Sequence, residues 1–229
     1  VPCPPDARRV DVDGSYIMAG FVDLHVHGGG DSDFMDEDAS AFPTIAKAHC
    51  AHGTTALCPT TMTCADSLLE KTIDLFLEAD KEPENGAELL GLHLEGPYFS
   101  AASKGAQPIG EQRIPEREDL ERILRRAKGS ILRWDAAPEL PNMELFAKVM
   151  AENGVLTSLA HSAATAPEAL RAFDWGFSHV THFYNACTTF HKKNGLVYSG
   201  IVEATYLRDD VTIELIGDGR HIPRESMLL

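Results

Sequence analysis

The sequence lacks long apolar runs, and no segment approaches the roughly 20 consecutive apolar residues that a membrane-spanning helix requires. Basic side chains are also few: 20 Lys and Arg stand against 35 Asp and Glu, for a formal net charge of −15. Nucleic acids and anionic membrane surfaces are bound by clustered Lys and Arg. We therefore expect no membrane span and no nucleic-acid partner, while an anionic small molecule could still bind in a local basic pocket.

The sequence is also poor in cysteine, with five in 229 residues and no C-x-x-C pair. An odd number of thiols without paired spacing is typical of a reducing compartment and not of a disulfide framework. The first residues, VPCPPDARRV, have neither the basic segment nor the apolar stretch of a secretory signal. These features favour a cytoplasmic protein.

What the chain does contain is a series of apolar, β-rich runs that alternate with amphipathic helical stretches. The runs cover residues 16–27, 54–60, 89–95, 131–139, 155–161, 179–184 and 211–217, with helical patterns such as 64–81 and 115–129 between them. This alternation predicts parallel βα units, and the continuous apolarity suits a sheet covered on both faces. We therefore predict an α/β fold, a TIM-like (β/α) barrel with seven of its eight βα units present.

Candidate metal ligands stand at the C-terminal ends of these runs. In FVDLHVHGGG, His25 and His27 are two residues apart and therefore project from the same face of a strand. Glu95, His161 and His182 each end a further run. Strand ends meet on one rim of a barrel, where active sites of this fold lie. Such nitrogen and oxygen donors suit zinc or a similar divalent ion, which lowers the pKa of a bound water toward ~7.

Five stretches carry a resemblance to a known family: FVDLHVHGGG, GLHLEGPYFSAASKGAQ, LAHSAAT, THFYNAC and GDGRHI. In this order they resemble the motifs of the N-acetylglucosamine-6-phosphate deacetylases of the amidohydrolase superfamily, over almost the whole chain from Asp11 to His221. The resemblance implies a barrel of the metal-dependent hydrolase type. It also implies hydrolysis of the acetamide of N-acetyl-D-glucosamine 6-phosphate to D-glucosamine 6-phosphate and acetate, as in amino-sugar catabolism.

The resemblance implies roles for the candidate ligands. Glu95, His161 and His182 would hold the principal metal ion. His25 and His27, with Glu95 as a bridge, would hold a second ion where two are bound, and Zn²⁺ is the expected metal.

Roles in substrate binding follow from the same resemblance. His221 would act in catalysis by donating a hydrogen bond to the acetamide carbonyl, beside the catalytic metal ligand Glu95. Asn185 and Ala186 would contact the sugar phosphate through backbone N–H groups, and Ala106 would line the same site. Lys193 stands where the family commonly has an Arg that reaches the phosphate from a neighbouring subunit, so the resemblance implies a homodimer.

The sequence also departs from the family pattern. The catalytic Asp of the eighth strand is not in it, and Asp218 belongs to the seventh strand, where packing beside the catalytic ring is its expected role. Residues 1–15 correspond to a remnant of a small β-sandwich segment, followed by an incomplete barrel over residues 16–229. Gln107 replaces the usual His. Because the catalytic Asp is not in the sequence, we expect the 229-residue chain alone to be a poor deacetylase.

Two other functions stay open from the sequence. One is an amidohydrolase that acts on a cyclic amide or an N-acyl amino acid. The other is an inactive truncated barrel that only binds a sugar phosphate. We expect no metal ligand among the remaining histidines, which are His49, His52, His93, His179 and His191.

Overall fold

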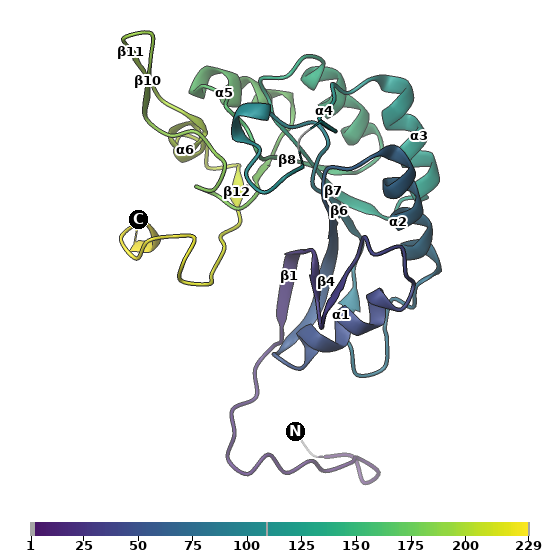
Figure 1. The fold of residues 1–229 in the computed structure, drawn as a ribbon. Coiled ribbons are helices and arrows are strands. Elements are labelled where there is room, and N and C mark those ends of the chain that lie inside the picture. The colour runs from purple at the N-terminus through teal and green to yellow at the C-terminus, as the bar shows by residue number, and fades with distance from the viewer. Residues whose placement is uncertain (1–2, 109, 229) are drawn as a thin grey trace.

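Seven parallel strands form one curled sheet in the computed structural model, which describes residues 3–108 and 110–228 (Figure 1). Their order across the sheet is β1-β4-β6-β7-β8-β9-β12. The bounds are β1 Phe21–Val26, β4 Thr54–Thr61, β6 Leu92–Leu94, β7 Ile131–Ala136, β8 Leu156–Leu159, β9 His179–Val180 and β12 Thr212–Ile213. The short β5, Glu88–Leu89, pairs with β4 beside this path. Each run that the sequence predicted as a strand therefore contains one, although most strands are shorter than predicted.

The sheet is a half-barrel and not a closed barrel. Among the described residues, β1 pairs with β4 and β12 pairs with β9, and these two outermost strands do not pair with each other. The concave face is consequently open on one side (Figure 1). This architecture is consistent with the predicted TIM-like barrel.

The N-terminal segment contains no strand within residues 3–20 and extends away from the sheet (Figure 1). Tyr16, which we expected at the start of the first strand, is fully exposed, and β1 begins only at Phe21. The structure therefore does not confirm a β-sandwich remnant at residues 1–15, of which residues 1 and 2 lie outside the described part of the chain.

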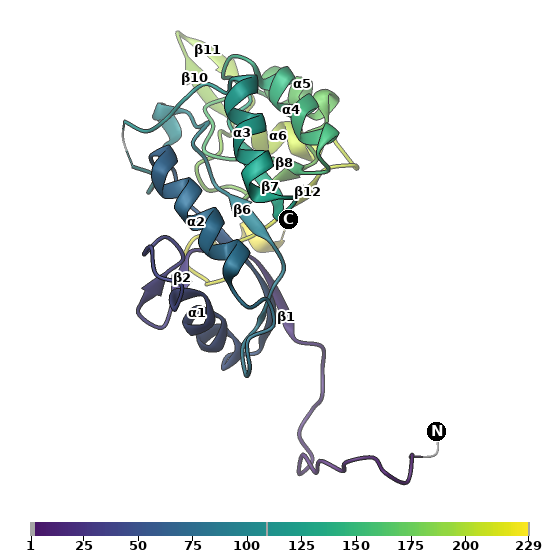
Figure 2. The ribbon, with the colours of Figure 1, turned by 90° about the vertical axis from the view of Figure 1, so that its right-hand side faces the viewer.

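The main helices cover the convex face of the sheet (Figure 2). They are α1 Ala41–Cys50, α2 Asp66–Glu78, α3 Arg117–Ala127, α4 Met143–Glu152, α5 Ala166–Trp175 and the shorter α6 Ile201–Tyr206. Single 3₁₀ turns occupy Ala101–Ser103 and Ser226–Leu228. Two small antiparallel pairs complete the fold: β2 Gly28–Gly29 with β3 Ser32–Asp33, and β10 His191–Lys193 with β11 Leu196–Tyr198. Among the described residues, no helix is both long enough and apolar enough to cross a membrane.

Strand β7 shows how the chain separates the two faces of the sheet. Trp134 points outward, where its ring packs 5.8 Å from Phe146 of α4 in a core of apolar side chains. Arg133 and Asp135, on either side of it, therefore point to the concave face, because successive strand residues alternate. Both are buried, and both contact His93 of β6. Charged side chains are buried only when partnered, so the concave face is organised around polar contacts.

Candidate metal centre

The five predicted ligands come together on the concave face. They lie in or just after four strands: His25 in β1 and His27 after it, Glu95 after β6, His161 after β8 and His182 after β9. All five line one cavity of about 1020 Å³. Their donor atoms form two groups that could each hold a metal ion, and Glu95 belongs to both. The expectation that strand ends would bring these residues together is confirmed.

The first group, which we call the principal triad, consists of Glu95, His161 and His182. Oε1 of Glu95 lies 3.0 Å from Nε2 of His161 and 3.1 Å from Nε2 of His182, and the two nitrogens are 3.1 Å apart. Zinc binds such ligands at ~2.1 Å, and the three atoms are close enough together for one ion to reach all of them at that distance. All three residues are buried.

The protonation of the two rings explains why a cation fits the principal triad. Nδ1 of His161 faces the carbonyl oxygen of Ser103, and Nδ1 of His182 faces that of Asn185, each at 3.1 Å. A carbonyl can only accept, so both Nδ1 atoms carry a hydrogen, and Nε2 is the ring atom of each histidine that could bind a metal ion. Two ring nitrogens and a carboxylate oxygen then face one another, and this donor set suits a cation.

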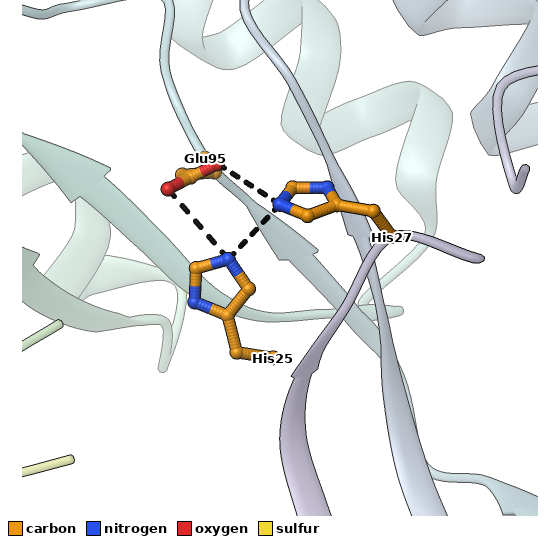
Figure 3. Close-up of side chains that lie close together, drawn as sticks. All are labelled: His25, His27 and Glu95. Carbon is orange, nitrogen blue, oxygen red and sulfur yellow. Dashed lines mark hydrogen bonds and ion pairs between the residues drawn. The ribbon is translucent and has the colours of Figure 1, made fainter. Parts of the chain in front are cut away.

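The second triad consists of His25, His27 and Glu95 (Figure 3). The Nε2 atoms of the two histidines are 3.1 Å apart, and Oε2 of Glu95 lies 3.3 Å from Nε2 of His27. Oε1 of Glu95 lies 3.6 Å from Nε2 of His25. The two carboxylate oxygens thus face different histidines, which is the geometry of a bridging ligand.

The pKa values of His25 and Glu95 reflect their mutual contacts. Burial alone would lower the pKa of His25, but hydrogen bonds to Glu214 and Glu95 raise it to about 10. Burial alone would raise the pKa of Glu95, but hydrogen bonds from the four histidines hold it well below its usual range. The charged Glu95 carboxylate is therefore stabilised by the imidazoles around it, and metal binding should release the proton of His25.

The backbone turns sharply at the ligands. His161 has φ 45° and His182 has φ 35°, both in the left-handed region that non-glycine residues rarely adopt. Residues held in such conformations cluster at functional sites. Gly96, directly after Glu95, has φ 98° and lies in a crowded position. A Cβ at this residue would lie 2.3 Å from Oγ1 of Thr63.

We expect Gly96→Ala to destabilise the protein, because the new Cβ would meet Thr63 in addition to the strain of a positive φ, which by itself costs about 1–2 kcal/mol. Thermal unfolding would show a midpoint lowered by about 2–4 °C for each kcal/mol. Gly129→Ala is the matched control, because Gly129 has φ 83° and nothing within 4 Å of the new Cβ. Equal midpoints for the two variants would contradict a steric role for Gly96.

The predicted substrate-binding residues lie around the same cavity. Ala106, Asn185, Ala186 and His221 all line it. The backbone N–H of Asn185 donates to the carbonyl of His182 at 2.9 Å, and its expected contact with the sugar phosphate stays a prediction. The side-chain Nδ2 of Asn185 is a buried donor without a hydrogen-bond partner among the described residues.

Two of the predicted residues need separate mention. Lys193 ends β10, but its side chain lies outside the described part of the structure. His221 is half exposed, and its Nδ1 lies 2.8 Å from Oδ2 of Asp218, which also accepts the backbone N–H of His221 on Oδ1. These hydrogen bonds, with that from Arg220, lower the pKa of Asp218 to about 2. Asp218 therefore lies directly against the ring of His221, and its role beside that ring stays a prediction.

Sequence reasoning assigned Gln107 no contact with a ligand, and it missed Glu214 and Arg133 behind the ligands. Gln107 is buried, donates from Nε2 to Oε2 of Glu95 at 2.6 Å, and accepts the backbone N–H of Thr63. Glu214 and Arg133 contact each other on the concave face, and Glu214 also contacts His25. A charge inside an apolar strand run, as at Arg133, was the signal that could have found this pair.

That the remaining histidines are not metal ligands stays a prediction. Among the described residues, neither candidate metal group includes any of them. His93 is nevertheless part of the site's surroundings, because its ring lies 4.8 Å from that of His25, and burial lowers its pKa to about 4.

Comparison with known proteins places this geometry in a family. The model of the amidohydrolase family matches residues 16–227. N-acetylglucosamine-6-phosphate deacetylase of Lysinibacillus sphaericus is 31% identical over 221 residues, covering 93% of this chain and 54% of the relative. N-acetylgalactosamine-6-phosphate deacetylase of Escherichia coli O157:H7 is 29% identical over 218 residues, covering 95% of this chain and 56% of the relative.

A solved structure agrees with these relatives. The crystal structure of N-acetylglucosamine-6-phosphate deacetylase from Pasteurella multocida superposes with a TM-score of 0.84 at 29% identity, covering 96% of this chain and 56% of that one. The chain therefore spans about half the length of the relatives that it matches. Because the family model covers nearly all of the described residues, and the His and Glu groups lie at the strand ends, the chain belongs to the amidohydrolase family.

Proposed function

We propose that this chain carries the metal centre of a deacetylase that hydrolyses the acetamide of N-acetyl-D-glucosamine 6-phosphate. The single observation that carries the proposal is the convergence of three lone-pair donors, from Glu95, His161 and His182, on one point of a large cavity. The similarity to deacetylases of N-acetylated amino-sugar phosphates supports this substrate class.

The donor set suits Zn²⁺, because imidazole nitrogen and carboxylate oxygen are ordinary zinc ligands and catalytic sites commonly use three protein ligands. When bound, such an ion would polarise the acetamide carbonyl and lower the pKa of water. Glu95, His161 and His182 would hold the principal ion. His25 and His27 would hold a second one, with Glu95 shared.

The remaining residues would position the substrate. His221 would donate a hydrogen bond from its ring to the acetamide oxygen, with Nδ1 held against the Asp218 carboxylate. The unpartnered Nδ2 of Asn185 is available to a sugar or phosphate oxygen. The contribution of Lys193 from a neighbouring subunit, and with it the homodimer, stays a prediction.

We expect acetate release from N-acetylglucosamine 6-phosphate to be slow in the 229-residue chain alone and to depend on added metal. A chelator should abolish it, and stoichiometric Zn²⁺ should restore it, because Glu95, His161 and His182 would hold the ion that polarises the acetamide carbonyl. A coupled acetate assay measures this. Matched substrates are N-acetylgalactosamine 6-phosphate and N-acetylglucosamine without phosphate.

The alternatives give different results in the same assay. Hydrolysis of an N-acyl amino acid or a cyclic amide, with no release of acetate from the sugars, would assign the centre to another amidohydrolase reaction. Binding of the sugar phosphate without acetate release, in the presence of bound Zn²⁺, would favour an inactive barrel. Because the chain spans about half of its relatives, this activity is tested on the chain itself and not inferred from theirs.

A further inference from the structure

Glu214 belongs to neither ligand group but lies at the centre of a buried polar cluster that contacts both. It follows β12 directly, and its side chain is 14% exposed. Oε1 lies 3.0 Å from Nδ1 of His25 and accepts the backbone N–H of His182 at 3.2 Å. Oε2 accepts a hydrogen bond from Arg133 at 2.6 Å. One carboxylate therefore connects β1, β7, β9 and β12 beneath the ligands.

The contact with His25 differs from those that hold the other three ring ligands. Nδ1 of His27, His161 and His182 faces a backbone carbonyl oxygen in each case. A side-chain substitution does not remove a backbone carbonyl, so these three contacts do not depend on the identity of a neighbouring residue. His25 alone among the four has its Nδ1 against a side chain, that of Glu214, while its Nε2 faces His27 and Glu95 (Figure 3).

The Glu214 carboxylate is itself held in place. Its backbone N–H donates to the carbonyl of Val180 and its carbonyl accepts the N–H of Phe183, so the main chain is fixed against β9 and the segment after it. Arg133 contacts both carboxylate oxygens, and its guanidinium also donates to Nδ1 of His93. His93 in turn has Nε2 2.8 Å from Oδ2 of Asp135. These contacts leave Glu214 one orientation toward His25.

We propose that Glu214 is a positioning residue that sets the tautomer and the ring orientation of His25, and thereby the affinity of the second triad for its metal ion. With the hydrogen on Nδ1 donated to Glu214, Nε2 keeps its lone pair for a cation. The proposal rests on the metal centre proposed above. It means that metal binding by the second triad depends on the Glu214 side chain, whereas metal binding by the principal triad does not.

Glu214→Gln tests this dependence because the amide cannot satisfy all of the groups around it. Arg133, the N–H of His182 and Nδ1–H of His25 are donors, whereas glutamine offers one accepting oxygen and one donating NH₂. With the oxygen kept toward Arg133, the NH₂ faces Nδ1 of His25. That nitrogen must then accept, which moves the hydrogen to Nε2, where the ion would bind.

The experiment is titration of the chelator-treated 229-residue chain with Zn²⁺ alone, by calorimetry, with the number of bound ions counted by native mass spectrometry. We expect the wild type to bind two ions. In Glu214→Gln the second ion should bind ~10–100-fold more weakly, the scale for loss of a partner behind a metal-ligating histidine, while the first ion is unaffected.

Asp135→Asn is the matched control. Asp135 is fully buried in the same cluster, and its contacts are with His93 and Arg133 and not with His25. It should lower the thermal midpoint as Glu214→Gln does but leave both affinities near the wild-type values. Circular dichroism confirms that both variants fold.

Four results would overturn the proposal. Unchanged affinity of the second ion in Glu214→Gln, with two ions in the wild type, rejects the role of Glu214 and leaves the metal centre intact. An equal loss in Asp135→Asn attributes the effect to general damage in the cluster. A wild type that binds one ion rejects the second site, and one that binds none rejects the metal centre itself.

Discussion

Glu95→Gln should remove both metal ions. Glu95 is the one residue common to the two triads, and each of its oxygens faces a different set of imidazoles. The substitution keeps the shape but removes the negative charge and replaces one oxygen by an NH₂ group. Changes behind a ligand alone cost ~10–100-fold in metal affinity, so loss of this ligand should weaken each site by more than ~100-fold. Metal content after dialysis, measured by plasma mass spectrometry, tests this.

The control for Glu95→Gln is Glu203→Gln, which removes a carboxylate that is hydrogen-bonded to Thr189 and to the backbone of Gly200, outside the cavity. This variant should retain the wild-type metal content. If Glu95→Gln also retained two ions, the shared role of Glu95 would be wrong, and the close contacts among the five side chains would need another explanation.

His221→Asn should leave the metal content unchanged and lower the rate of the chemical step by ~100-fold or more, which is the scale for losing one donor to a developing oxyanion. The prediction applies to any preparation of the protein that releases acetate from the sugar phosphate. His221 lines the same cavity as the ligands without belonging to either triad. The kcat of the variant, determined beside its zinc content, separates catalysis from metal binding.

Asp218→Asn is the companion variant for His221. It retains a hydrogen-bond acceptor that holds the ring through Nδ1 but removes the carboxylate charge beside it, so kcat should fall less than in His221→Asn. Normal turnover in His221→Asn would exclude this residue from the reaction. A loss of zinc in either variant would show that the pair supports the metal centre and not the substrate.

The sequence could predict the ligands because each of them ends an apolar run, and parallel strands bring such ends together. Strand lengths were harder. The run 179–184 is apolar in pattern, yet β9 ends at Val180, because the chain turns through positive φ at His182 and Tyr184. The residue types do not predict that turn. The start of helix α5, in contrast, is predictable from its capping box of Thr165 and Glu168 and from the Pro in its first turn.

Partners behind the ligands could not be derived in the same way. A strand pattern shows that Arg133 and Glu214 interrupt apolar runs, but not that residues 81 positions apart meet on the concave face. That contact depends on the order of the strands and on the curl of the sheet. Gln107 is a similar case, because its amide reaches Glu95 from a loop that has no periodic pattern.

The sharing of Glu95 between the triads has a thermodynamic consequence. Occupation of the principal triad would fix the carboxylate through Oε1 and so hold Oε2 toward His27, while two cations bridged by one carboxylate also repel each other. The difference between these effects is a coupling free energy. By linkage it has the same value whichever ion binds first. A zinc titration of this protein should therefore be described by two intrinsic affinities and one coupling constant, and not by two independent sites.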